Sequence, residues 1–159
     1  MASSATIRSA GRWDAIAELP GSLSANEAAW LEAHGFLGGV QERLVGHFGS
    51  AAEVYAAVEQ FRSAADARTE LARRYAQAQQ LGTLPGSRFV PFRVPLIPQS
   101  VGYDLTAGTS GPAIAFAVGD FVYWVSSVGA PGGRGAPTRA QLIAAATAWS
   151  RRMRASGRA

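Results

Sequence analysis

The sequence contains no cysteine and no lysine, and only two histidines. Without cysteine the chain can form no disulfide, no thiol nucleophile and no thiolate metal site. All of the 15 basic residues are arginine and alanine is frequent, a bias that indicates a GC-rich genome. Only 16% of the residues are charged while 48% are hydrophobic, which excludes the composition of disordered chains. A chain of 159 residues with this composition is expected to fold as one domain.

Long apolar runs are also missing. The first ten residues lack the apolar stretch of a secretion signal, and no segment reaches the roughly 18 apolar residues that a membrane-spanning helix needs. The sequence itself therefore predicts neither an export leader nor a membrane anchor.

Catalytic and metal-binding motifs are not found in the sequence. His34 and His47 lack the spacing of a local metal site, and His34 is expected to cap the end of a helix. No serine lies in a G-x-S-x-G motif, and Gly132-Gly-Arg-Gly135 lacks the G-K-[ST] ending of a phosphate loop. We interpret Asp104 as a solvent-facing strand residue and Asp120 as a hairpin-turn residue. The sequence thus predicts no enzyme, no cofactor and no metal.

The positive charge is concentrated only at the end of the chain. The formal net charge is +4, and the one cluster of arginines is Arg151, Arg152, Arg154 and Arg158. In the last turns of a helix these side chains favour the helix dipole, and we expect them to lie in water. The pattern does not favour binding of nucleic acid.

The residue pattern of the first half of the chain predicts two helices and two strands. Residues 1–22 are expected to be a flexible lead. Ser24 and Glu27 have the spacing of a capping box, which predicts a helix over 24–34, and a strand is predicted from Gly38 to about His47.

The alanine-rich stretch from Ser50 to Gln80 allows two interpretations, one long helix or a strand followed by a helix. A capping signal at Ser63–Asp66 favours the second, with a strand over 53–61 and a helix over 64–80. On that helix, Glu70 and Arg74 are four residues apart and are expected to pair on the outer side.

The second half is rich in strand signals. Strands are predicted over 88–94 and 100–105, and Pro91 places the first of them at a sheet edge. A hairpin at the centre of the sheet is predicted over 114–125. Its two strand segments, 114–118 and 121–125, are rich in β-branched and aromatic residues and flank a possible two-residue turn at Gly119-Asp120. A glycine-rich loop is expected over 129–137, followed by a helix that begins after a capping box at Thr138.

This order of elements predicts an α+β fold, in which a mainly antiparallel sheet is flanked by helices. We divide the chain into the lead at 1–22, a single domain at 23–155 and a short tail at 156–159.

The order of sequence motifs along the chain also resembles that of a known group of proteins. The stretches AHGFLGG, VYAAVEQFRSAADA, VPLIPQSVGYDL and AIAFAVGDFVYWVSSVG, with a closing helix, resemble actinobacterial-type extracytoplasmic domains related in fold to PsbP-like and LpqN-like proteins. The resemblance covers about residues 24–155 and includes no catalytic motif. It implies an extracytoplasmic location, with export or membrane proximity supplied by a segment outside this chain.

The aromatic residues of the predicted sheet supply the candidate contact surface. Because Tyr123 and Trp124 point to opposite faces of a strand, at least one is expected to be accessible, and Phe92 and Arg93 extend the surface. The function predicted is a non-catalytic extracytoplasmic binding or accessory domain that engages a protein partner or an apolar ligand. The alternatives are a structural subunit of a larger assembly and a small hydrolase that would use Asp104.

Overall fold

The computed structural model describes residues 2–8, 10–11, 13, 27–45, 53–106, 110–128 and 137–156. The strands are β1 (Ala2–Ile7), β2 (Phe36–Val45), β3 (Glu53–Phe61), β4 (Arg88–Phe92), β5 (Val101–Thr106), β6 (Ser110–Val118) and β7 (Phe121–Val128), and the helices are α2 (Glu27–Ala33), α3 (Ala64–Leu81) and α4 (Arg139–Ala155). The strands form one sheet in the order β1-β2-β3-β7-β6-β5-β4, and every neighbouring pair is antiparallel. The predicted α+β fold with a mainly antiparallel sheet is therefore confirmed.

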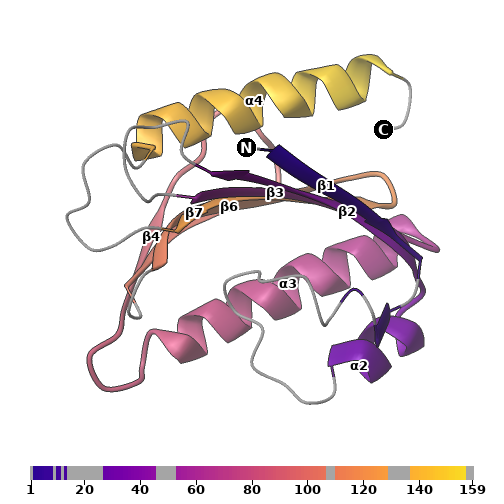
Figure 1. The fold of residues 1–159 in the computed structure, drawn as a ribbon, viewed down its shortest axis with the longest axis horizontal. Helices are drawn as coiled ribbons and strands as arrows, with labels where there is room; N and C mark the ends of the chain where they lie inside the picture. Colours follow the sequence, from indigo (N-terminus) through magenta and orange to yellow (C-terminus); the bar gives the residue numbers. More distant parts are fainter. Residues whose placement is uncertain are drawn as a thin grey trace.

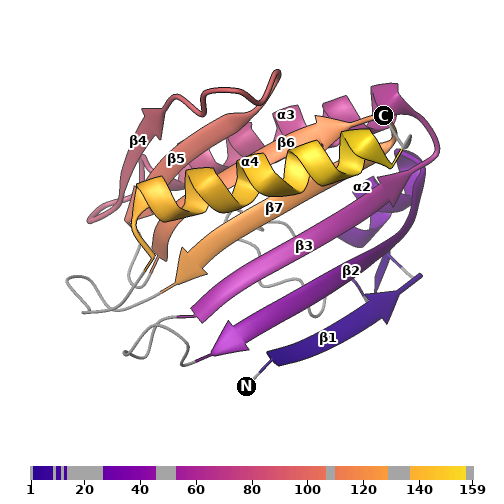
Figure 2. The same ribbon diagram turned by 90° about the horizontal axis from the view of Figure 1, so that it is seen from above.

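The helices lie on both faces of the sheet. Helices α2 and α3 lie on one face and α4 lies on the other (Figure 1). Helix α4 contacts β6 and β7. Seen from the α4 side, strands β1, β2 and β3 extend beyond the helix (Figure 2). Among the described elements, α4 alone packs on this face, and the helix covers only part of the width of the sheet.

The start of the chain differs from the expected flexible lead. Ala2–Ile7 forms the edge strand β1, which pairs with β2 over its whole length, from Ala2 opposite Leu44 to Ile7 opposite Gly39. The stretch Ala-Ser-Ser-Ala-Thr-Ile shows no alternation of apolar and polar residues, so the sequence did not reveal the strand. The pairing comes from the free edge that β2 offers, a tertiary feature.

The strand-then-helix interpretation of the alanine-rich stretch is confirmed. Strand β3 occupies the predicted residues, and its side chains alternate between fully and partly buried positions from Ala56 onward. Ser63 caps α3, and its hydroxyl accepts a hydrogen bond from the backbone N–H of Asp66 at 3.1 Å.

The predicted hairpin is confirmed as β6 and β7, and β7 is the middle strand of the sheet. The turn is made possible by Gly119, whose φ of +57° is the left-handed conformation that glycine adopts without strain. Strand β4, which contains Pro91, is at a sheet edge as expected. Most of the predicted glycine-rich loop, residues 129–136, lies outside the described residues.

The last helix also begins where the sequence predicts. The hydroxyl of Thr138 accepts a hydrogen bond from the Gln141 N–H, and the side chain of Gln141 accepts one from the Thr138 N–H at 2.8 Å. Leu142 and Ala146 are buried against the sheet, whereas Trp149 and Met153 are only partly buried. The three arginines at 151, 152 and 154 are exposed, as expected.

We predict that Ser63→Ala and Thr138→Ala each lower the free energy of unfolding by about 1 kcal/mol, because each leaves a helix N-terminus without its side-chain acceptor. Denaturant titration measures the change. Asp at either position should retain most of the stability, and losses below about 0.3 kcal/mol in both alanine variants would contradict the capping roles.

Candidate functional site

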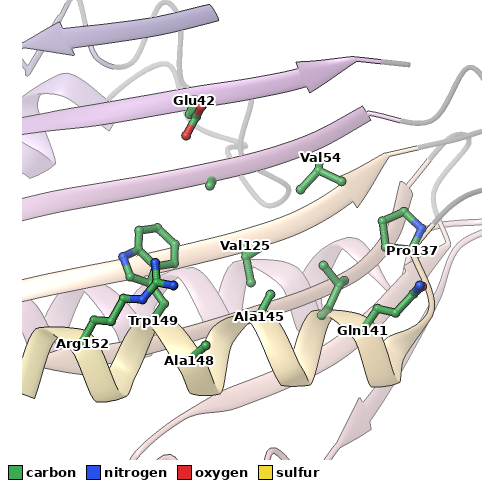
Figure 3. Close-up of a pocket in the computed structure, with 11 residues that line it drawn as sticks. Glu42, Val54, Val125, Pro137, Gln141, Ala145, Ala148, Trp149 and Arg152 are labelled. Carbon is green, nitrogen blue, oxygen red and sulfur yellow. The ribbon is translucent and has the colours of Figure 1, made fainter. Parts of the chain in front are cut away.

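An apolar groove runs beside α4 where the helix leaves the sheet uncovered. It has a volume of about 750 Å³. Its described lining residues come from β2, β3, β7, α4 and the segment just before α4: Glu42, Val54, Ala56, Val125, Pro137, Gln141, Leu142, Ala145, Ala148, Trp149 and Arg152. Figure 3 shows the side chains of the helix facing those of the sheet across this space. This volume lies within the usual range of small-molecule sites.

The alternation of β3 explains why the floor of the groove is apolar. Successive side chains of a strand point to opposite faces, so Val54, Ala56 and Val58 share the α4 face, and Ala57 and Glu59 share the other. Val54 is buried, while Ala56 and Val58 are partly exposed. The floor is therefore made of small apolar side chains, of which Ala56 and Val58 stay partly exposed beside α4.

A second hollow of about 230 Å³ continues along the same strands. Val58 of β3 and Val40 of β2 line it, and Val40 has 41% of its surface exposed. Since Val54 and Val58 are four residues apart on β3, about 13 Å separates the two ends of this apolar strip. The two hollows thus follow one line along β3.

The groove offers a ligand apolar surface and few polar groups. Glu42, Gln141 and Arg152 are the polar side chains among its described lining residues. The backbones of β2, β3 and β7 are paired with one another beneath it, so the floor presents no free row of amides. This lining suits the binding of an apolar group better than chemistry on a polar one.

Two of the four predicted contact residues are not at the surface. Tyr123 is 0% exposed and Trp124 is 2% exposed, which corrects the expectation that one of them would be accessible. They do point to opposite faces, but both faces of the central strand β7 are covered, by α4 on one side and by α3 on the other.

Phe92 and Arg93 lie elsewhere, beside a separate hollow of about 300 Å³ that Tyr75 and Ile97 also line. Arg93 is exposed and Phe92 partly so. The four candidates therefore do not form one surface, and Phe92 is contacted instead by the guanidinium of Arg139, 4.4 Å from its ring centre.

On the opposite face of the sheet lies a buried ionic cluster of Glu27, Glu59, Glu70, Arg73 and Arg74. Arg74 Nη2 donates to Glu59 at 2.7 Å, and Arg73 donates to both Glu27 and Glu70. This corrects the expected outer position of Glu70 and Arg74, which are 0% and 1% exposed. The cluster ties α2 and α3 to β3.

Indole groups complete the cluster. Trp13 Nε1 donates to Glu59 at 2.7 Å, Trp124 Nε1 donates to the other oxygen of Glu59 at 3.3 Å, and Trp30 Nε1 donates to Glu70 at 2.9 Å. Each carboxylate therefore has several donors, which a buried charge requires. The lining of the groove and this cluster do not overlap, so we interpret the cluster as structural.

The two central carboxyl groups of the cluster shift in opposite directions. Complete burial raises the pKa of Glu59 above its ordinary value, and the nearby Glu70 adds to the rise despite the opposing Arg74. Burial also acts to raise the pKa of Glu70, but Arg74 and Arg73 outweigh it and lower that pKa overall.

The other candidate chemical groups have structural partners. His34 Nδ1 donates to the carbonyl oxygen of Trp30 at 2.8 Å, and its ring stacks on that indole, at the end of α2 where a cap was predicted. Asp104 forms an ion pair with Arg139, and Asp120 lies in the hairpin turn and accepts from Gln60 at 3.1 Å. His47 lies outside the described residues. Within the described ranges no group of His, Cys, Asp and Glu residues could hold a metal ion.

Comparison with known proteins establishes the fold and no family. No protein-family model matches the chain, and no curated protein matches it. A similar solved structure is the extracellular domain of PknH from Mycobacterium tuberculosis, with a TM-score of 0.54 and 13% sequence identity over 96% of this chain and 82% of that one. The likeness shows a shared α+β fold and does not support the PsbP-like or LpqN-like assignment in particular. In the described part of the chain, no helix is long and apolar enough to cross a membrane.

The opposite pKa shifts in the ionic cluster predict opposite effects of pH. Because the pKa of Glu59 is raised in the folded state, the contribution of Glu59 to the free energy of unfolding is fully present below its ordinary pKa of 4.5. This contribution is lost as pH rises through the pKa of the folded state. The lowered pKa of Glu70 means that its contribution is present above 4.5 and is lost as pH falls.

The test compares unfolding free energies of the wild type, Glu59→Gln and Glu70→Gln across pH. The advantage of the wild type over Glu59→Gln should shrink as pH rises above 4.5, whereas its advantage over Glu70→Gln should shrink as pH falls below 4.5. The same pH trend in both variants would show that the assignment of the two shifts is wrong.

Proposed function

We propose that this protein is a non-catalytic extracytoplasmic binding domain, and that the groove beside α4 takes an apolar ligand. The observation that carries the proposal is the groove itself, a space of about 750 Å³ whose described lining is apolar apart from three side chains. Burial of apolar ligand surface there would supply the binding free energy, at roughly 25 cal/mol per Å².

The extracytoplasmic location is supported by two likenesses. The order of sequence motifs resembles extracytoplasmic domains, and the fold is shared with the extracellular domain of PknH. Protease treatment of intact cells of the producing organism would test the location. Digestion of the protein in unbroken cells supports it, and full protection contradicts it.

A non-catalytic function is supported by the structural contacts that the candidate catalytic side chains already make. Asp104, the acid that a hydrolase would need, is paired with Arg139, and His34 is stacked on Trp30. A structural subunit remains the weaker alternative, since the described residues offer for it only the unpaired outer edges of β1 and β4. The groove, by contrast, has the size and chemistry of a ligand site.

We predict that Ala145→Phe abolishes saturable binding of the neutral probe N-phenylnaphthylamine, because the phenyl ring fills the groove between α4 and the sheet. Ala145 is exposed, so the variant should unfold within about 0.5 kcal/mol of the wild type. Fluorescence titration of the probe, with the free energy of unfolding measured alongside, gives both results.

The matched control is Ala144→Phe, which adds the same ring at the neighbouring exposed position of α4, outside the groove lining. It should bind the probe like the wild type. A wild type that shows no saturable binding, or an Ala145→Phe variant that binds equally well, would contradict the groove as the binding site.

A further inference from the structure

The charges around the groove are placed at one end of it. Glu42 and Arg152 are the ionisable groups among the described lining residues. In Figure 3, Arg152 and Trp149 lie together at one end, and Pro137 and Gln141 mark the other. Val54 and Val125 lie on the sheet between the two ends. The groove is thus apolar along its length and charged at one end.

Arg152 is available to bind an anion. Four other arginines, Arg43, Arg73, Arg74 and Arg139, form ion pairs with carboxylates. Arg152 has no such partner among the described residues, and it is exposed on the rim of the groove. An anionic ligand could therefore pair with this guanidinium without breaking an existing ion pair.

The backbone beneath the groove limits which kind of ligand fits. Because the strands of the floor pair with each other, an extended peptide would find no row of backbone partners there and would bury its own amides unpaired. A hydrocarbon chain has no such groups and loses nothing on this surface. The lining therefore favours a ligand that is apolar along a chain and polar at one end.

We propose that the groove binds a single-chain amphiphile with an anionic head group, and that Arg152 selects the charge of the head. The proposal rests on the proposed function. The chain lies over Val54, Ala56 and Val125, and the head group meets the Arg152 guanidinium. Arg8, which lines the adjoining hollow, adds a second positive charge near the strip. Glu42 faces the same space from β2 and opposes the anion, so the head lies on the α4 side.

Calorimetric titration of the full chain with decanoate, decanol and decyltrimethylammonium tests the head-group preference at constant chain length. The wild type should bind decanoate about fivefold more tightly than decanol, the size expected of a solvent-exposed ion pair, and decyltrimethylammonium most weakly. Added salt should reduce the preference for decanoate, because exposed charges are screened.

Arg152→Gln should remove the preference of the protein for decanoate over decanol. Arg151→Gln, which removes a neighbouring exposed arginine outside the groove lining, is the matched control and should keep the preference. Glu42→Gln should strengthen decanoate binding up to about fivefold by removing the opposing carboxylate.

The outcomes separate this inference from the function on which it rests. If the wild type binds none of the three probes, both the proposed function and the anionic preference fail. If it binds decanol or decyltrimethylammonium as tightly as decanoate, or if Arg152→Gln keeps the wild-type preference, the groove is a binding site but the role of Arg152 is wrong.

Discussion

The arrangement of this molecule depends on a mismatch between the width of its sheet and the width of a single helix. The seven described strands, at a spacing of about 4.8 Å, make a sheet roughly 30 Å wide, whereas a helix with its side chains is about 10 to 12 Å across. Helix α4 packs on β6 and β7, and β2 and β3 keep part of their apolar side chains accessible on that face. The groove is the direct consequence of this partial cover.

The opposite face of the sheet is equally wide, but it is covered in a different way. Helices α2 and α3 share that face, and the ionic cluster joins them to β3 through Glu59 and Arg74. Such a cluster adds little to stability compared with apolar packing, but removing one partner leaves a buried charge unpaired. Its donors and acceptors fix how the two helices are placed. Within the described part of the chain, one face is thus closed by specific pairing, and the other is covered only in part by α4.

Local features of the fold could be predicted from the sequence, and features set by distant residues could not. The caps at Ser63 and Thr138 and the turn at Gly119 depend on neighbouring residues, and the structure has them where expected. The pair Glu70 and Arg74 looked like an ordinary surface pair because its partner Glu59 lies on another element. Strand β1 likewise exists through its pairing with β2.

The candidate site shows the same limit. Alternation correctly placed Tyr123 and Trp124 on opposite faces of β7, but only the tertiary structure shows that both faces of this central strand are covered. The groove residues gave no signal of their own: Val54, Ala56 and Ala145 are common core or helix residues, and their exposure follows from where α4 lies. The one signal for the site in the sequence is that the predicted strands carry more apolar residues than the predicted helices could cover.

The most direct test of the groove as a ligand site is an NMR measurement of which side chains touch a bound apolar ligand. Intermolecular nuclear Overhauser effects from N-phenylnaphthylamine should reach the methyl groups of Val54, Val125, Leu142 and Ala145, which line the groove. Contacts confined to the hollow beside Phe92 and Ile97, or no contacts with any described methyl group, would contradict the account.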